Sequence, residues 1–220
     1  MTTTARRKKR AAVYGLRRRE KPYRERGIRL LAGVDEAGVS PLAGPVVAAA
    51  VIMPPESSIR GVDDSKKILN PQTRDELARQ ILAEAVAVGV GLSRPREIDR
   101  INIYQASLVS MARAVRRLRE RPELVLVDAR KVPGIDMPQE AHVGGDGKFY
   151  QIACASLIAK TFRDALMRRM DARYPGYGFA DHKGYPTPEH CRLLRELGPC
   201  WLHRRGYRRV AELNQVEMFE

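Results

Sequence analysis

Two adjacent carboxylates, Asp35 and Glu36, offer the clearest chemistry in this sequence of 220 residues. They follow an apolar stretch, residues 28–34, which is typical of a buried strand, and a second apolar stretch, residues 46–52, comes after a turn of small residues. Paired carboxylates at the end of a core strand are costly unless a cation or hydrogen bonds compensate them. Carboxylate oxygens are ligands that a hard divalent cation prefers. The pair therefore predicts a metal site.

Two further acids have a similar setting. Asp128 ends the short apolar run of residues 124–127, and Asp146 lies in a glycine-rich segment ahead of a long predicted helix. If the strands that end in Asp35 and Asp128 are parallel neighbours, both acids lie at the same edge of the sheet, where ligands bind in open α/β sheets. Four carboxylates there would hold two Mg²⁺-like ions about 4 Å apart, an arrangement that activates water for phosphodiester hydrolysis. Each acid taken alone is better explained as an ordinary strand-end or turn residue.

The composition favours one globular catalytic domain. Hydrophobic residues make up 44% of the chain and charged residues 30%, which is typical of a soluble protein. No apolar run approaches the roughly 20 residues that span a bilayer, and the N-terminus lacks the apolar core of a signal peptide. Cys154, Cys191 and Cys200 are odd in number and lack CxxC spacing. They predict reduced thiols in a cytoplasmic protein, with neither a zinc site nor a disulfide framework.

The net charge of +14 is concentrated at the N-terminus, because residues 1–27 hold 11 lysines and arginines against 2 acids. Such a segment cannot bury apolar area, so we expect a disordered arm at 1–27, a catalytic domain at 28–213 and a tail at 214–220. The arm is either a solvated tail or a nucleic-acid contact that adds a salt-sensitive, sequence-independent term to binding. We favour the second interpretation. A membrane-surface role is disfavoured because no apolar helical face accompanies the charges.

Strand and helix patterns alternate through the rest of the chain. Asn70 is placed to cap a helix whose first position is Pro71, with Leu77, Ile81 and Leu82 as its buried stripe. The other predicted elements are strands at about 28–36, 45–53, 85–92 and 124–128, a short strand near 140–143, and helices at about 98–119, 149–170 and from Thr187 onward.

Several spaced segments resemble the ribonuclease HII family, in family order, over about residues 29–210. They are Gly-Val-Asp-Glu-Ala-Gly at 33–38, the segments at 41–49, 64–67, 101–107 and 126–128, the helix at 152–164, and the loop segments at 174–179, 182–185 and 187–190. The resemblance implies an α/β fold of the ribonuclease H type. Its features would be a mixed five-stranded sheet flanked by helices and a C-terminal helical segment.

The resemblance also implies an activity and a site. Members of the family cleave RNA in RNA–DNA hybrids and ribonucleotides embedded in duplex DNA, leaving 5′-phosphate and 3′-hydroxyl ends in replication and ribonucleotide excision repair. The metal-binding acids of the family map onto Asp35, Glu36, Asp128 and Asp146, the same set that the strand ends predict. Two ions, Mg²⁺ or Mn²⁺, are expected during catalysis.

One turn departs from the family pattern. The usual Gly-Arg-Gly, which grips the ribonucleotide beside the scissile phosphate, is here Gly38-Val39-Ser40. Glycines let backbone groups approach the 2′-hydroxyl that distinguishes RNA from DNA, and the arginine adds a charged donor. Val39 supplies no such donor. Tyr185 matches a family tyrosine that stacks on the next deoxyribose, although Pro186, where glycine is common, could shift its ring.

Other polar residues have two interpretations each. Lys66 resembles a family lysine that contacts backbone phosphate, and Asn102 is a similar candidate, but a solvated surface role competes for both. His182 and His203 are candidates for phosphate contact or for anchoring a loop. Asp164 is expected to form a structural ion pair with Lys160, one helical turn away.

Three functions remain open on the sequence. The first is the family activity, exercised by a monomer on RNA–DNA hybrid and on duplex DNA that contains ribonucleotides. The second is the same nuclease restricted to continuous hybrids by the Val39-Ser40 change, and the third is a catalytically weak hybrid-binding module. A sliding clamp is a candidate partner through Gln215, Met218 and Phe219, although a frayed tail explains the same residues.

Overall fold

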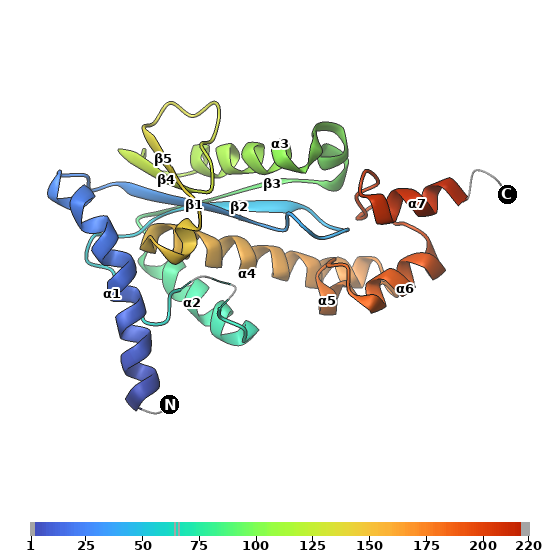
Figure 1. The fold of residues 1–220 in the computed structure, drawn as a ribbon, viewed down its shortest axis with the longest axis horizontal. Helices are drawn as coiled ribbons and strands as arrows, with labels where there is room; N and C mark the ends of the chain where they lie inside the picture. Colours follow the sequence, from blue (N-terminus) through green and yellow to red (C-terminus); the bar gives the residue numbers. More distant parts are fainter. Residues whose placement is uncertain (1–2, 64, 66, 217–220) are drawn as a thin grey trace.

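The structure is a computed structural model that describes residues 3–63, 65 and 67–216. Its centre is one mixed sheet with the strand order β3-β2-β1-β4-β5 (Figure 1). Antiparallel pairing joins β1 to β2 and β2 to β3, whereas β4 is parallel to β1 and β5 is parallel to β4. The strands are β1 (Leu31–Ala37), β2 (Val46–Ile52), β3 (Ala87–Ser93), β4 (Leu124–Asp128) and β5 (Gln139–His142). The predicted mixed five-stranded sheet is confirmed.

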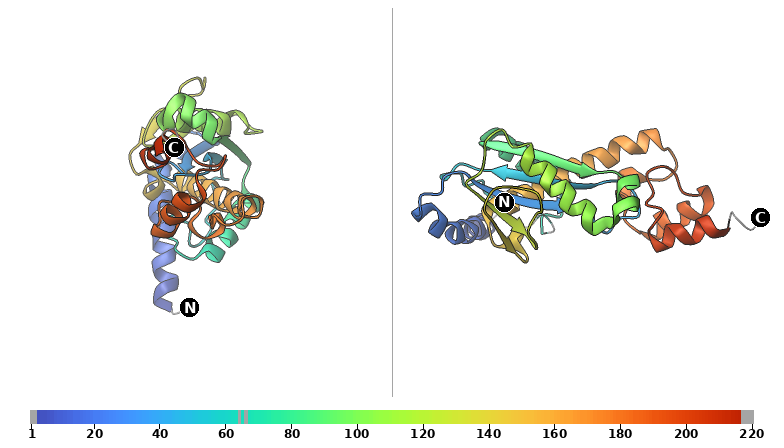
Figure 2. Two further views of the ribbon diagram at one scale, coloured as in Figure 1. Left: turned by 90° about the vertical axis from the view of Figure 1, so that its right-hand side faces the viewer. Right: turned by 90° about the horizontal axis from the view of Figure 1, so that it is seen from above.

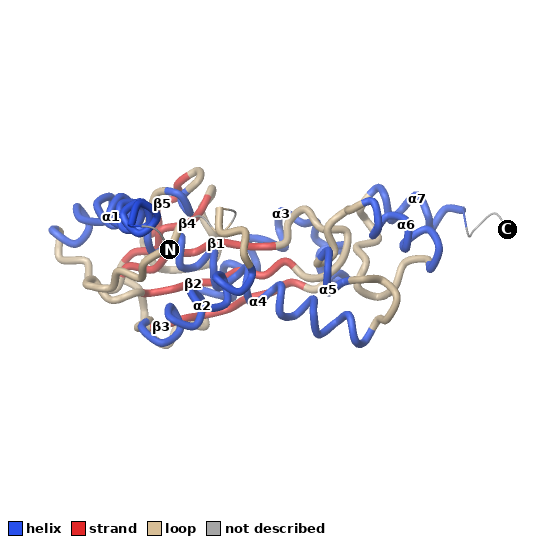
Figure 3. The backbone as a smooth tube through the Cα atoms, turned by 90° about the horizontal axis from the view of Figure 1, so that it is seen from below, coloured by secondary structure: helices blue, strands red, loops and turns tan. Residues whose placement is uncertain are grey.

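Helices cover both faces of the sheet. The helix α3 (Pro95–Arg116) packs on one face, while α4 (Tyr150–Arg173) and α2 (Pro71–Glu84) cover the other (Figures 1 and 3). A short 3-10 turn, η1 (Gly145–Gly147), precedes α4. The C-terminal segment consists of α5 (Phe179–His182), α6 (Pro188–Leu197) and α7 (Arg208–Val216). It lies at the opposite end of the molecule from α1 (Thr3–Glu25) (Figure 2).

Small residues allow α4 to lie close against β1. A Cβ atom at Gly33 would stand 2.1 Å from the backbone carbon of Gln151, so only glycine fits at this crossing. The first turns of α4 present Ala153, Cys154 and Ala155, all fully buried. The Gln151 side chain accepts a hydrogen bond from the backbone N–H of Met53 at 2.8 Å, which fixes the start of α4 against the end of β2. This close contact holds the helix in register with the strand that carries Asp35.

The predicted helix starts are confirmed. The Asn70 side chain accepts hydrogen bonds from the backbone of the first turn of α2, and the Thr187 hydroxyl accepts one from the first turn of α6. Leu77 and Ile81 are buried as expected, but Leu82 is 56% exposed, so its assignment to the buried stripe was wrong. A residue directly after Ile81 lies about 100° further around the helix, away from the sheet.

The N-terminal segment differs from the expected disordered arm. It forms α1, and Val13 and Leu16 are buried in the same apolar cluster as Tyr150 and Cys154 of α4. Three residues at spacings of three and four, Val13, Leu16 and Glu20, form a narrow face that the arginines on either side obscure in the composition. The boundary expected at residue 27 therefore does not separate α1 from the core. At the other end α7 extends to Val216, three residues into the expected tail.

None of the described helices combines the length and the apolar character needed to cross a membrane.

Candidate active site

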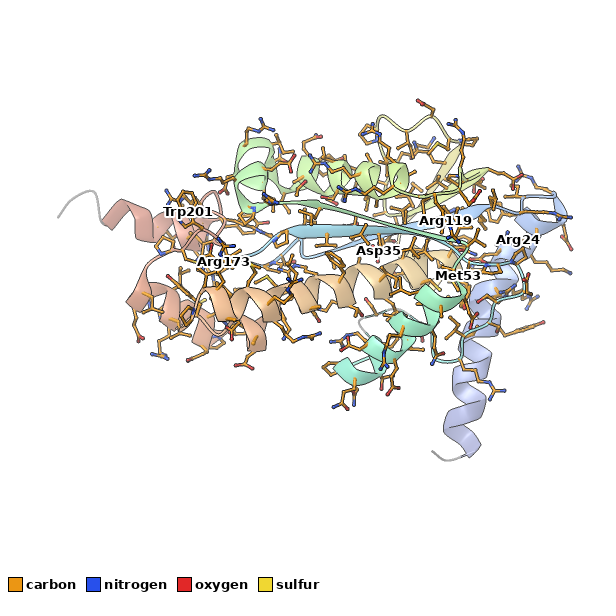
Figure 4. All side chains as sticks on the ribbon, turned by 180° about the vertical axis from the view of Figure 1, so that it is seen from behind. Arg24, Asp35, Met53, Arg119, Arg173 and Trp201 are labelled. Atoms are coloured by element: carbon orange, nitrogen blue, oxygen red, sulfur yellow. The ribbon has the colours of Figure 1, made fainter. Side chains whose placement is uncertain are left out.

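The parallel pairing of β1 and β4 brings the predicted acids together. Val34 of β1 is in register with Val127 of β4, so Asp35 and Asp128 follow at the same edge of the sheet. Figure 4 shows Asp35 near the middle of the long axis, between the sheet and α4. A solvent-open cavity of about 730 Å³ lies there. Its lining consists of Asp35, Glu36, Asp128, the turn at 37–40, Ser65, Ser156, Lys160 and Tyr185.

The three carboxylates of this cavity share one electrostatic field. Burial, followed by the negative charges of Glu36 and Asp128, raises the pKa of Asp35 well above its usual range, although a hydrogen bond with Ser156 opposes the rise. A divalent cation between these groups would relieve the repulsion and favour the ionised form. Among the described residues, no three acidic, histidine or cysteine side chains already surround one point as metal ligands.

Asp146, the fourth predicted acid, lies beside the cavity and is not part of its lining. Its buried side chain accepts a hydrogen bond from the Gly147 N–H at 2.9 Å, inside η1. The preceding residue ties this turn to the site, because the Gly145 N–H donates to Oδ1 of Asp128 at 2.6 Å. The structure thus brings three of the four predicted acids into one cavity and places the fourth one residue from a direct contact with Asp128.

The altered turn is held through its backbone by a fully buried arginine. Arg204 donates hydrogen bonds to the carbonyl oxygens of Gly38 at 2.6 Å, Val39 at 2.8 Å and Gly44 at 2.9 Å. Gly38 has a φ of +93°, in the region that favours glycine. Ser40 is outside that region, so its conformation does not require the glycine found in the family. The position of this backbone is consequently independent of the side chains at 39 and 40.

A second fully buried arginine, Arg163 of α4, joins this turn to the loop that carries Tyr185. It donates hydrogen bonds to the carbonyl oxygens of Ala43, Pro45 and Lys183, each at 3.0 Å. Burial, and then the neighbouring Arg204, lower the pKa of Arg163 to about 10, which leaves it charged at neutral pH. Neither arginine was predicted from the sequence, because a basic residue in a helix or a basic tail usually indicates a solvated surface.

Tyr185 lines the cavity beside a cation, Lys160 of α4, which also lines it. The Lys160 ammonium lies 5.2 Å from the centre of the Tyr185 ring. The expected ion pair between Lys160 and Asp164 is present at 2.8 Å, and Arg74 also approaches Asp164, at 3.4 Å. Lys160 therefore has a fixed position in the wall of the cavity that also contains the carboxylates.

Buried histidines fix the Tyr185 loop. The Cys200 N–H donates to Nδ1 of His203 at 3.0 Å, so the ring proton of His203 is on Nε2. This Nε2 donates to Nε2 of His190 at 3.1 Å. His190 in turn donates from Nδ1 to the Tyr185 carbonyl oxygen at 2.8 Å. Burial lowers the pKa of His190 to about 4 and that of His203 to about 3, so both are neutral.

For His182 and His203, the structure favours loop anchoring over phosphate contact. His182 accepts a hydrogen bond from the Gly184 N–H at 3.0 Å and contacts the Tyr177 carbonyl oxygen at 2.7 Å through its other nitrogen. Both rings are buried, and His182 bonds to the backbone through both nitrogens, whereas His203 bonds to the Cys200 backbone through one nitrogen and to the His190 ring through the other. Neither ring is presented to a phosphate.

Asn102, one of the two predicted phosphate contacts, lies away from the described cavity. Asn102 has a φ of 63° at a kink in α3, and its side chain accepts a hydrogen bond from the Gln105 N–H at 3.0 Å. It acts there as an internal cap for the second part of α3 and is absent from the cavity lining. Lys66 lies outside the described residues, as does the clamp-binding candidate Phe219.

A sheet of this order, with acids at the ends of β1 and β4, defines a ribonuclease H-like protein, and solved structures agree. The chain is similar to ribonuclease H2 from Pyrococcus horikoshii, with a TM-score of 0.75 and 26% identity over 86% of this chain and 99% of that one. It is also similar to ribonuclease HII from Archaeoglobus fulgidus, solved in complex with PCNA, with a TM-score of 0.69 and 28% identity over 84% and 97% of the two chains.

Sequence comparison identifies the family. Residues 32–210 match the family model described as ribonuclease HII. A curated ribonuclease HII from Myxococcus xanthus is 52% identical over 188 residues, which cover 86% of this chain and 64% of that relative's length. This chain thus spans a little less than two thirds of that protein. It belongs to the ribonuclease HII family.

Proposed function

We propose that this chain is a metal-dependent endoribonuclease. It would act in the cytoplasm on the RNA strand of RNA–DNA hybrids and on ribonucleotides embedded in duplex DNA, leaving 5′-phosphate and 3′-hydroxyl ends in replication and repair. The observation that carries the proposal is the cavity in which Asp35, Glu36 and Asp128 face Tyr185 and the turn at 38–40. Membership in the ribonuclease HII family supports it.

The donor set fits hard divalent cations. Asp35, Glu36 and Asp128, with Asp146 beside them, offer carboxylate oxygens of the kind that Mg²⁺ and Mn²⁺ prefer. When bound, the ions would supply an activated water and neutralise charge at the scissile phosphate. The protein's own contribution is to hold the acids at fixed strand ends, to place Lys160 in the wall of the same cavity, and to position the sugars that flank the phosphate.

The fixed backbone of the turn supports recognition of a single ribonucleotide. Arg204 holds the carbonyls of Gly38 and Val39 within the turn, and Arg163 holds that of Ala43 just after it, so backbone groups would meet a 2′-hydroxyl in one position whatever the side chain at 39. The second candidate function, cleavage of continuous hybrids only, is favoured by Val39 itself. It lines the cavity where the family places an arginine, and it is 38% exposed.

Cleavage of two labelled duplexes tests both functions. One carries a single ribonucleotide in DNA and the other a continuous RNA strand paired with DNA; each is incubated with Mg²⁺ and with Mn²⁺, and Asp35→Asn is the inactive control. Incision on the 5′ side of the single ribonucleotide would support the first function. Cleavage of the continuous hybrid alone would support the second. Binding of hybrid without metal-dependent turnover would refute both functions and support the third alternative, a hybrid-binding module.

We also infer that the C-terminal residues contact a sliding clamp. Support comes from the Archaeoglobus fulgidus relative, which was solved in complex with PCNA. In this chain α7, which includes Gln215 and directly precedes residues 217–220 in the sequence, lies at the end of the molecule remote from α1 (Figure 2). Titration of the purified host clamp with the full chain and with Phe219→Ala would test the contact. Equal affinity in the two titrations would contradict it.

A further inference from the structure

A groove between α1 and η1 contains basic residues that the proposed chemistry does not use. The groove has a volume of about 1050 Å³, including space open to solvent. Its lining includes Gly15, Arg18 and Arg19 of α1, Gly147 of η1, and Asp63 and Lys67 of the loop between β2 and α2.

The helix that forms one wall is anchored, so its arginines are presented in fixed positions. Val13 and Leu16 are buried in the core cluster, and Glu20 accepts a hydrogen bond from the Gln151 N–H at 2.8 Å, at the start of α4. Gly15, Arg18 and Arg19 lie on another flank of the same helix, three and four residues apart. A basic surface on an already ordered helix loses less conformational entropy on binding than a disordered arm does, because its backbone is already fixed.

The charge of this flank is not neutralised within the described structure. Arg18 and Arg19 are both exposed, and neither is within salt-bridge distance of an acid among the described residues. Of the two acids in residues 1–27, Glu20 is buried and Glu25 pairs with Lys21 at 3.2 Å. The exposed flank is therefore strongly positive, as a site for a polyanion requires.

The turn η1 connects the groove with the acid cavity. Gly147 lines the groove, Asp146 precedes it, and Gly145 donates its N–H to Asp128 in the cavity. A nucleic-acid strand with one phosphate at the carboxylates would thus pass η1 and then reach α1. The three residues of η1 link the two surfaces. The acids repel phosphates, so a basic track immediately beside them would supply the attraction that holds the strand.

We propose that this groove binds the sugar–phosphate backbone of the substrate duplex, with Arg18 and Arg19 as contacts to consecutive phosphates beside the cleavage site. The assignment rests on the proposed function, because it takes the substrate to be a nucleic-acid duplex. It adds that α1 is a sequence-independent part of the binding surface. Phosphate contacts of this kind position a duplex without reading its bases.

The test measures binding separately from cleavage. In the Asp35→Asn background, affinity for a fluorescent RNA–DNA hybrid is measured by anisotropy at several salt concentrations. Replacing both arginines, Arg18→Ala with Arg19→Ala, is expected to weaken binding and to make the slope of log K against log[salt] shallower by about 2, at about 0.9 per phosphate contact. Replacing both with lysine keeps the charge and should retain most of the slope.

A second pair of variants introduces charge without removing contacts. A Cβ atom at Gly15 meets nothing within 4 Å, so a larger side chain fits there without a clash. Gly15→Glu should weaken hybrid binding several-fold, while Gly15→Gln, which has almost the same shape, should bind as Asp35→Asn alone does. Arg195→Ala with Arg208→Ala removes two exposed charges at the far end of the molecule and is expected to leave the slope nearly unchanged.

Equal affinity of Gly15→Glu and Gly15→Gln, or equal losses from the α1 pair and the far pair, would overturn the groove as a binding surface. The result is distinguishable from failure of the proposed function. If the unmodified protein still cleaves the hybrid while the α1 variants bind normally, only the groove is wrong. If the chain neither cleaves nor binds hybrid, both proposals fail.

Discussion

At the scale of single residues, Asp35 lies at the centre of the site in a position that is electrostatically unfavourable for a charged carboxylate. The Asp35→Asn variant should lose at least about 100-fold in cleavage, more than the usual cost of removing a group that only orients a metal ligand. Without metal it should also be more stable than the unmodified chain, by about 1 kcal/mol, because burial and two neighbouring carboxylates penalise its charge. Cleavage rates and chelator-treated thermal melts check the two effects. A variant that is inactive and less stable would show a packing role.

The side chain at position 39 is expected to tune specificity and not the rate of the chemical step. Val39 is partly exposed at the cavity wall, so an arginine fits there without displacing the core. Val39→Arg should raise the ratio of single-ribonucleotide to continuous-hybrid cleavage by about tenfold, the effect of one charge-assisted hydrogen bond. The two-duplex assay measures the ratio. Val39→Gln is the control for size, and an equal ratio in both variants would contradict the role of the charge.

At the scale of elements, two buried arginines turn separate loops into one wall of the site. Arg204 donates to three backbone carbonyls, of which that of Val39 also accepts from the Tyr207 hydroxyl. Arg204→Met should destabilise the fold by about 3 kcal/mol, since the carbonyls of Gly38 and Gly44 would lose their arginine donor. Arg205→Met is the matched control. Arg205 is exposed, and its hydrogen bond to Asp99 uses only its backbone N–H, so the change should cost less than about 0.5 kcal/mol. Denaturant unfolding compares the variants.

The docking of α1 is expected to weaken as pH rises. Burial raises the pKa of Glu20 from 4.5 to about 7, against the lowering effect of its hydrogen bond to Gln151. A carboxyl whose folded-state pKa is raised contributes stability that is full below about pH 4.5 and is lost as pH rises through 7. Between pH 5 and pH 8 the chain should lose about 1–3 kcal/mol of unfolding free energy. Glu20→Gln should remove this loss, and equal pH profiles for the two proteins would exclude Glu20 as its cause.

At the scale of the whole molecule, the C-terminal segment should be the part most sensitive to acid. The pKa values of His190 and His203 are lowered by burial, so their contribution to stability is full above about pH 6.5 and is lost as pH falls toward 4. Trp201, the only tryptophan, lies two residues from His203 and reports on this segment. Its fluorescence should change between about pH 6.5 and 4, together with loss of cleavage. Unchanged fluorescence with lost activity would place the acid effect in the carboxylates.

The sequence predicted what local patterns determine. Apolar runs predicted the strands, and Asn70 and Thr187 predicted the starts of two helices. The acids at strand ends predicted the position of the candidate site. The docking of α1 was not predictable by the same means. Its partner surface on α4 is more than 100 residues away in the sequence, and a buried face of a few residues is hidden among arginines. Composition describes the average environment of a segment, whereas burial depends on which other segment it meets.

The candidate site shows the same limit of prediction from local sequence patterns. Asp35, Glu36 and Asp128 converge because strand pairing is a regular geometry that a pattern can anticipate. The lateral position of Asp146 depends on η1, and the burial of Arg163 depends on carbonyls from two loops. Irregular segments such as these are positioned by tertiary hydrogen bonds, for which a single sequence carries no periodic signal.

The contact between Glu20 and Gln151 has a consequence for synthesis, because the two residues are 131 positions apart in the chain. At about 5–20 residues per second, α1 leaves the ribosome on the order of ten seconds before the start of α4 does. Until α4 emerges, the buried face of α1 has no partner surface to pack against. The docking of α1 is therefore a late step of folding, although α1 is made well before the helix that it contacts.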